Sequence, residues 1–185
     1  MNEIIKLRKL YDLKNVYRAN SIGKRKESSA EHSWSSLLLA DFLLSGCDEE
    51  IDKLRVFELL LYHDIIEVES GDIPIHHVEA RKNKKEKEKA ALEELKKYVP
   101  EKIKDRYLEL FDEYEKKETK EAKFAKAVDK IDAVLHEIDY KEDWKGWTEE
   151  MVREFHGKAT AEFEVTKDFF EKLVSYAKEN GFFDQ

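Results

Sequence analysis

Residues 62–74 read YHDIIEVESGDIP, and this stretch places an ionisable pair, His63 and Asp64, inside an apolar segment. Residues 52–68 are apolar on nearly all sides, which predicts one central, buried helix that ends at the GDIP sequence. Burying the Asp64 carboxylate without a partner would cost several kcal/mol or force it to take up a proton. A bound cation would compensate both side chains, so the stretch indicates a metal site in the core. The alternative is a core histidine that its neighbour hydrogen-bonds.

Further metal ligands must come from other segments of the chain. His32 opens a predicted helix within AEHSW, and Asp129 is a carboxylate on a mostly apolar helix within FAKAVDKIDAV. With the pair at 63–64 they form a set of two imidazoles and two carboxylates from three helices. Such mixed nitrogen and oxygen ligation suits Mn, Fe, Co, Ni or Zn better than Ca. Asp132 competes with Asp129 for the same role, and a histidine such as His32, taken alone, is more often an exposed residue at a helix start.

The rest of the chain also has helical spacing, and no segment shows convincing alternation with a period of two. With only 6 Gly and 2 Pro among 185 residues, 41% of them charged, long helices and few loops are expected. We predict an all-α protein of about seven helices in a single domain, 1–185, with its core in 10–140 and C-terminal helices in 148–179 that pack on this core or form a dimer interface. The other expected helices are 2–12, 31–45 (capped by Gly46), 79–97, 101–117, 120–140, 148–157 and 160–179.

Composition limits the possible partners and compartment. The single cysteine, Cys47, excludes an internal disulfide framework and fits a reducing cytoplasm. A net charge of -8 disfavours broad binding to polymeric nucleic acid. No apolar run approaches the ~18 residues that a membrane span needs. We therefore expect a cytoplasmic protein with no membrane or nucleic-acid partner.

Several segments resemble, in the same order, the HD-domain 5′-deoxynucleotidase family within the HD-domain metal-dependent phosphohydrolases. A bare His-Asp dipeptide is weak evidence, whereas the ordered set with GDIP is specific, and it covers about three quarters of the chain. The segments are LKNVYR (13–18), RKESSAEH (25–32), HDIIE (63–67), GDIP (71–74) and EAKFAKAVDK (121–130).

The resemblance implies an all-α HD-domain bundle with one divalent metal ion (Co, Mn, Ni, Fe, Zn or Mg) in its core. It assigns His32, His63, Asp64 and Asp129 as the metal ligands. For the last position it favours Asp129 over Asp132, because the AVDK sequence carries the match.

The resemblance also implies catalytic and substrate-binding residues. Glu67 lies on the same helical face as the His-Asp pair by its spacing, and the family role of this residue is to orient or deprotonate the attacking water. Asp72 matches an acidic residue on the substrate side, near the sugar or the leaving oxygen. Arg18 matches an arginine that binds phosphate with its planar fork. Ala19 follows it, where related proteins have a tryptophan beside the ribose 2′ position, so the sugar preference stays open.

These resemblances imply a 5′-nucleotidase that hydrolyses (deoxy)ribonucleoside 5′-monophosphates and forms a homodimer. The alternatives are an HD-domain enzyme for nucleoside triphosphates or phosphodiesters, and a non-catalytic metal- or nucleotide-binding module. His76 and His77 could reach a phosphate or base, or lie in a loop. His136 could support the site or be an interior histidine. The charged run 81–89 is a solvated helix face or a lid, and the tryptophans at 144–147 pack, form a dimer contact or stack on a base.

Overall fold

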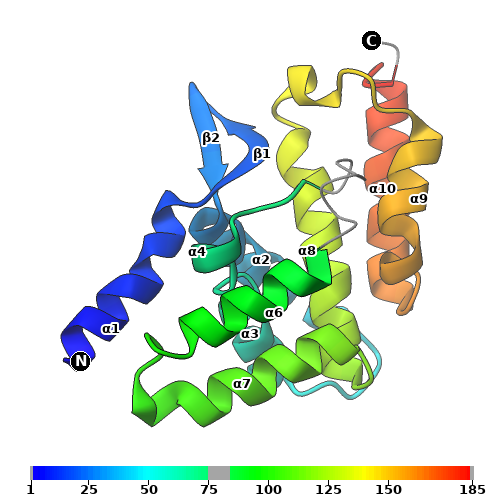
Figure 1. Ribbon diagram of the computed structural model, residues 1–185. Coiled ribbons are helices and arrows are strands. Elements are labelled where there is room, and N and C mark those ends of the chain that lie inside the picture. Colours follow the sequence, from blue (N-terminus) through cyan, green and yellow to red (C-terminus); the bar gives the residue numbers. More distant parts are fainter. Residues whose placement is uncertain (1, 75–83, 184–185) are drawn as a thin grey trace.

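Helices dominate the protein, whose computed structural model describes residues 2–74 and 84–183 (Figure 1). The predicted all-α class is confirmed. The helices are α1 (Glu3–Leu10), α2 (Ser29–Leu44), α3 (Lys53–Tyr62), α4 (Glu67–Ser70), α6 (Lys84–Leu95), α7 (Glu101–Lys116), α8 (Lys120–Glu137), α9 (Glu149–Thr160) and α10 (Glu164–Glu179). Short 3₁₀ turns cover Tyr11–Asn15 and Lys141–Trp144, and strands β1 (Tyr17–Ile22) and β2 (Arg25–Ser28) pair as a hairpin. No helix in the described residues is long and apolar enough to cross a membrane.

The long helix α8 organises the main core. It contacts α2, α3, α7, α9 and α10, and in Figure 1 it stands between the α2–α3 side of the molecule and the α9–α10 pair. Thr119 caps its N-terminus by accepting a hydrogen bond from the Ala122 N–H. Phe124, Val128 and Ile131 are fully buried on one face, as the spacing of an amphipathic helix requires. This helix therefore offers several neighbours one rigid surface.

A second apolar cluster holds α1, α4, α6 and α7 together. Ile66, at the start of α4, is buried in this cluster, next to the segment that carries His63 and Asp64. Burial of Ile66 therefore anchors that segment against the second cluster. The buried members are Leu10, Ile66, Ala91, Leu95, Val99 and Tyr107.

The single helix predicted over 52–68 is wrong, because α3 ends at Tyr62 and a turn separates it from α4. The Nδ1–H of His63 donates to the Leu60 carbonyl at 2.7 Å, the residue three positions earlier. The backbone that follows forms a turn with a hydrogen bond across three residues, in which the Glu67 N–H donates to the Asp64 carbonyl at 2.9 Å. His63 and Asp64 therefore lie in a turn at a helix end, which frees both side chains to face the same point.

The hairpin is the other element that the periodicity did not reveal. Its strands are short, and their register shifts between Tyr17 and Ser21, so no regular alternation is present. Gly23 makes the turn with φ +58°, a left-handed conformation that favours glycine. Ser28 ends β2 and caps α2 in a capping box with Glu31. The hairpin thus delivers the chain directly into the helix that carries His32.

Several helix boundaries also differ from the prediction; for example, α8 ends at Glu137 rather than at 140, and α10 begins at Glu164 rather than at 160. α2 ends at Leu44 with Ser45 as its C-cap in a right-handed conformation, so Gly46 is not the expected cap. The helix predicted over 79–97 is described only as α6, from Lys84 to Leu95. The expectations for His76 and His77, and for the first part of 81–89, lie outside the described residues.

Candidate metal centre and substrate cavity

Four side chains from three parts of the fold converge on one point. His32 comes from the first turn of α2, His63 and Asp64 from the turn after α3, and Asp129 from α8. His32 Nε2 lies 3.1 Å from Asp129 Oδ1 and 3.9 Å from Asp64 Oδ2. His63 Nε2 lies 3.2 Å from Asp64 Oδ1, and ligand atoms of His32, His63 and Asp129 lie within 4.8 Å of one another. The structure thus brings together all four residues that were predicted to bind metal.

The chemistry of this cluster fits a divalent metal ion. Within the described residues, His63 Nε2 and Asp64 Oδ2 are buried and have no hydrogen-bond partner, an arrangement that costs free energy unless something else binds them. Two imidazole nitrogens and two carboxylates form a mixed ligand set of the kind that first-row transition metals take. A cation at the point that these atoms face would satisfy both orphaned atoms.

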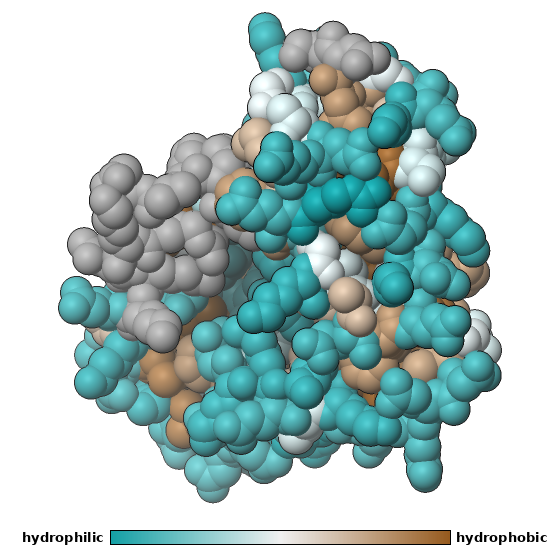
Figure 2. All heavy atoms as spheres, turned by 90° about the vertical axis from the view of Figure 1, so that its right-hand side faces the viewer, coloured by the Kyte–Doolittle hydropathy of each residue, from teal (hydrophilic) through white to brown (hydrophobic). Residues whose placement is uncertain are grey.

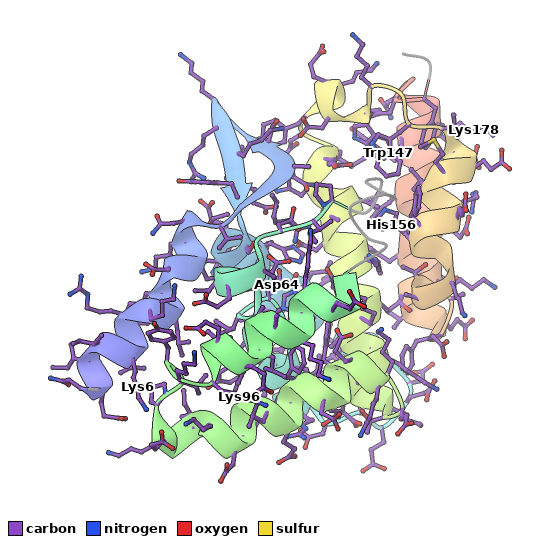
Figure 3. The ribbon with its side chains drawn as sticks, viewed as in Figure 1. Lys6, Asp64, Lys96, Trp147, His156 and Lys178 are labelled. Atoms are coloured by element: carbon purple, nitrogen blue, oxygen red, sulfur yellow. The ribbon has the colours of Figure 1, made fainter. Side chains whose placement is uncertain are left out.

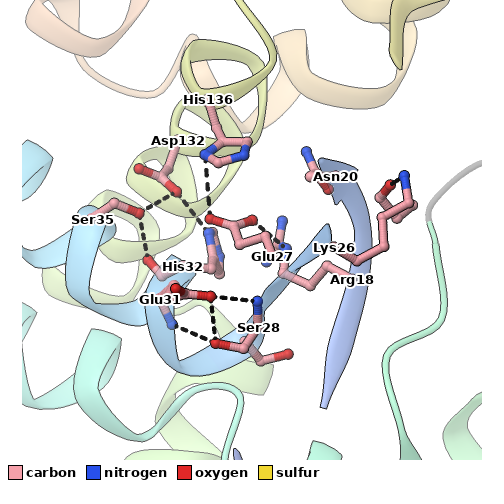
Figure 4. Close-up of polar contacts among 12 residues, drawn as sticks. Arg18, Asn20, Lys26, Glu27, Ser28, Glu31, His32, Ser35, Asp132 and His136 are labelled. Carbon is pink, nitrogen blue, oxygen red and sulfur yellow. Dashed lines mark hydrogen bonds and ion pairs between the residues drawn. The ribbon is translucent and has the colours of Figure 1, made fainter. Parts of the chain in front are cut away.

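Neighbouring groups fix the direction in which each imidazole points. Asp132 Oδ2 lies 2.7 Å from His32 Nδ1 and also accepts a hydrogen bond from Ser35 Oγ at 2.9 Å (Figure 4). His63 Nδ1 donates to a backbone carbonyl. Both rings therefore turn Nε2 toward the cluster, the arrangement that partners of metal-binding histidines usually enforce. Asp129 lies on the Nε2 side of the His32 ring, and Asp132 lies on its Nδ1 side.

The charge state of His32 depends on its two carboxylate partners. Burial and the nearby Arg18 cation disfavour the imidazolium, but hydrogen bonds to Asp129 and Asp132 outweigh them and raise the pKa of His32 to about 9. Without metal, His32 is therefore protonated at neutral pH and forms an ion pair with Asp129. A metal ion at Nε2 would have to displace this proton.

Metal affinity should consequently increase with pH. Between about pH 6 and pH 9 each unit should strengthen binding by up to about tenfold, because one proton leaves His32 for each ion bound. Calorimetry in buffers with different ionisation enthalpies measures the protons released. An affinity that does not change over this range would contradict the protonation state assigned to His32.

Glu67 lies beside the cluster at the start of α4. Ser29 Oγ donates a hydrogen bond to Glu67 Oε2 at 2.7 Å. Burial raises the pKa of Glu67 well above its ordinary value, and the negative charges of Asp64 and Asp72 add to the effect. A carboxylate in this environment is a stronger base than one in water.

Arg18 extends from β1 to the same place. Its Nη1 lies 3.8 Å from Asp64 Oδ2, and only 13% of its side chain is exposed. Burial of Arg18 lowers its pKa, but the negative charges of the surrounding carboxylates outweigh this effect and raise the pKa of Arg18 above its ordinary value. These carboxylates are Asp64, Glu27, Asp129 and Asp72. The structure therefore places a buried, permanent cation next to the candidate metal ligands.

A cavity of about 470 Å³ opens onto this cluster. Arg18, Asp64, Glu67, Asp72 and Asp129 all line it, so each predicted catalytic and substrate-binding residue reaches the same space.

Much of the remaining wall of the cavity comes from α8, α9 and the segment between them, through Lys130, Glu137, Trp147, Met151 and His156. Figure 3 shows Asp64 near the middle of the molecule, with His156 and Trp147 toward the α9–α10 side. Seen from that side, the surface is mostly hydrophilic, with apolar patches between the polar side chains (Figure 2). The cavity thus combines a charged region with an aromatic side chain and is large enough for a small polar ligand.

Two residues near Asp129 were not predicted. Lys126 Nζ lies 2.7 Å from Asp129 Oδ2 and 5.0 Å above the Tyr114 ring, and it lines the cavity. Tyr114 donates its hydroxyl to the same carboxylate oxygen at 3.1 Å. These contacts leave Oδ1 to face His32 Nε2 and the candidate metal position. Lys126 precedes Asp129 by three residues on a helix, a spacing that could have indicated an ion pair.

Comparison with known proteins agrees with this fold and site. Residues 10–169 match the family model described as "HD domain". A 5′-deoxynucleotidase HDDC2 from Xenopus laevis is 35% identical over 133 residues, which cover 70% of this chain and 65% of that protein. The chain therefore spans just under two thirds of the length of this curated relative.

Two solved structures have a similar fold. One is described as a predicted metal-dependent phosphohydrolase from Magnetospirillum magnetotacticum MS-1; it has a TM-score of 0.86 and 30% identity, with 97% of this chain and 93% of that chain covered. The other is an HD-domain phosphohydrolase from Listeria innocua, with a TM-score of 0.63, 25% identity and coverage of 94% and 84%.

A helical bundle with one small hairpin gathers a histidine, a His-Asp pair and a distant aspartate at one buried point. This arrangement is that of a helical protein with a candidate metal site in its core. The matched segment includes all four of these residues and spans well over half of the chain. The chain belongs to the HD domain family, and its fold is that of the HD-domain phosphohydrolases.

Proposed function

We propose that the protein is a metal-dependent phosphohydrolase that removes the 5′-phosphate from nucleoside monophosphates and releases nucleoside and inorganic phosphate. The observation that carries the proposal is the position of Arg18, a buried cation whose Nη1 lies 3.8 Å from Asp64 in the cavity of the candidate metal ligands. Arg18 and a bound metal ion would form a pair of positive centres, and a phosphate dianion is the kind of group that such a pair would bind. The name of the Xenopus relative supports the nucleotide as substrate.

One divalent ion would be held by His32, His63, Asp64 and Asp129. Its identity among Co, Mn, Ni, Fe, Zn and Mg is open, because the ligand set accepts several of them. When bound, the ion would supply positive charge that polarises the phosphoryl group and makes a water molecule easier to deprotonate.

The side chains around the ligands would perform the remaining steps. Arg18 holds the phosphate and neutralises its charge, since phosphoryl transfer depends mainly on positioning and electrostatics. Glu67 accepts the proton of the attacking water, and the hydroxyl of Ser29 fixes the orientation of its carboxyl group. Asp72 lines the same cavity and would lie on the side of the leaving 5′-oxygen, which takes its proton from water or from the protonated form of Asp72.

The sugar would lie against Ala19, Asn20 and Glu137, which line the cavity with Arg18. Asn20 Nδ2 donates to Glu137 Oε1 at 2.9 Å. Burial, and then the charge of Asp143, raise the pKa of Glu137 to about 8, so near neutral pH its carboxyl is mostly protonated and can donate to a hydroxyl. The small side chain of Ala19 leaves room beside these groups. We therefore propose that both ribose and deoxyribose nucleotides are substrates.

Two other functions remain to be tested against this one. A triphosphohydrolase or phosphodiesterase could use the same scaffold, and a non-catalytic module could keep the metal for structure. Glu67, Asp72 and Arg18 favour catalysis, because a structural metal site needs none of them.

A substrate panel distinguishes these functions. Metal-free protein supplied with Mn or Co should release phosphate from dAMP, dGMP and their ribose counterparts, and chelation should stop the reaction. Faster cleavage of nucleoside triphosphates or cyclic nucleotides would favour the other enzymes. Tight binding of nucleotide without turnover for any divalent metal would favour the binding module.

We also propose that the protein forms a homodimer through α2. Trp34, Leu38 and Phe42 recur at every fourth residue of this helix and are 68%, 61% and 60% exposed, an apolar stripe of the kind that interfaces cover. Replacing Trp34 by glutamate should convert the dimer to a monomer without unfolding it. Sedimentation equilibrium measures the change. A wild-type protein that is monomeric at high concentration would contradict the proposal, as would a variant that stays dimeric.

A further inference from the structure

Glu27 is a buried carboxylate to which the proposed reaction gives no role. It lies on β2 with only 2% of its surface exposed, between two groups that carry or can carry positive charge. Its Oε2 is 3.2 Å from Arg18 Nε, and its Oε1 is 3.4 Å from His136 Nδ1 (Figure 4). Burying an acidic residue so deeply is unfavourable unless such partners accompany it.

The contact with Nε determines how the Arg18 guanidinium is presented. An arginine binds a phosphate best through two parallel N–H groups. Glu27 Oε2 forms an ion pair with Nε at 3.2 Å, outside hydrogen-bond geometry, while Nη1 lies 3.8 Å from Asp64 Oδ2 at the candidate metal ligands. Without Glu27 the guanidinium could rotate, and its phosphate-binding edge would lose its fixed direction.

His136 in turn holds Glu27. Its Nε2 lies 2.7 Å from the Ser21 carbonyl, which can only accept, so Nε2 carries a proton. Nδ1 faces Glu27 Oε1 at 3.4 Å, and a second proton shared between these two atoms would join the side chains. Asp129, Asp132 and His136 follow one another at helical spacing along α8. One helix therefore carries a candidate metal ligand, the partner of His32 and the partner of Glu27.

We propose that Glu27, held by His136, is a positioning residue that sets the orientation of the Arg18 guanidinium for phosphate. The proposal rests on the proposed function only in taking Arg18 as the anion-binding group. Glu27 does not touch the phosphate, and His136 acts through Glu27. The pair thus joins the hairpin that carries Arg18 to the helix that carries Asp129.

Binding of inorganic phosphate to the Mn-loaded protein tests this proposal without requiring turnover. The Glu27→Gln substitution keeps the size of the side chain but removes its charge, and it should weaken phosphate binding by about tenfold or more. Metal affinity and melting temperature should change little. In an Arg18→Ala background the same substitution should change phosphate affinity less than about twofold, because a residue that acts through Arg18 has no effect without it.

A control is available in Glu113, a partly buried glutamate that likewise pairs with an arginine, Arg55, at 2.8 Å but lies outside the cavity lining. Glu113→Gln should leave phosphate affinity unchanged. If Glu27→Gln does not fold, His136→Gln takes its place, with an expected loss of about threefold to tenfold that also disappears in the Arg18→Ala background.

Three outcomes would overturn the proposal: unchanged phosphate affinity in Glu27→Gln, an equal loss with and without Arg18, or no phosphate binding by the wild-type protein. Failure of the proposed nucleotidase function has a different signature. In that case the wild-type protein binds phosphate but releases none from any nucleotide.

Discussion

Replacing Glu67 by glutamine should lower kcat by about 10³-fold while the protein keeps its metal, because general base catalysis contributes an effect of this size. The amide has nearly the shape of the carboxyl group and can still accept a hydrogen bond from Ser29, which donates at 2.7 Å in the structure. It cannot accept the proton of the attacking water. Steady-state phosphate release, with metal content determined on the same sample, measures the effect.

Glu69 provides the control, because it is another acidic residue of α4 and pairs instead with Lys9 at 2.9 Å. Glu69→Gln should leave kcat within about twofold of the wild-type value, as expected for a residue outside the cavity lining. If Glu67→Gln retained most of its kcat, Glu67 would not be the base. If it lost the metal, Glu67 would be a ligand instead.

Replacing Asp129 by asparagine should weaken metal binding by about 100-fold or more and abolish turnover. Its Oδ1 faces His32 Nε2 at 3.1 Å, while Lys126 and Tyr114 contact the other oxygen. The substitution keeps the shape but removes the charge that a cation requires, and groups around metal ligands alone change affinity by about 10–100-fold. Titration against a fluorescent chelator measures the affinity. The rise in melting temperature on adding metal should shrink in parallel.

Asp132→Asn is the matched comparison on the same helix. It contacts His32 at Nδ1 rather than at the cluster, so its loss of metal affinity should be smaller, about tenfold. A larger loss in Asp132→Asn than in Asp129→Asn would mean that the two roles are reversed.

The helices and the chemistry of the site could be predicted from the sequence because the patterns that indicate them lie within short segments of the chain. The spacing of Phe124, Val128 and Ile131 identifies a buried helical face without knowledge of the partners. The His63–Asp64 pair is informative because charged groups in an apolar segment require compensation. Between Asp129 and Asp132 the sequence could not decide by spacing, since both lie on the same helix and both contact His32.

The rest depends on contacts between distant segments. The turn after Tyr62 follows from hydrogen bonds of His63 and Asp64 that are invisible in a pattern of apolar residues. The role of Glu27 requires the hairpin to meet α8 more than a hundred residues later in the chain, at His136. Short strands with a register shift do not indicate such a contact, and a single glutamate in a charged segment does not indicate it either.

Phosphate release from dAMP by purified, metal-free protein, with and without added Mn, is the most direct test of the central claim. We expect turnover that requires the metal, stops with chelator and is lost in Asp129→Asn. Hydrolysis that continues without any divalent metal would contradict the account, and so would metal-loaded protein that binds the nucleotide but releases no phosphate.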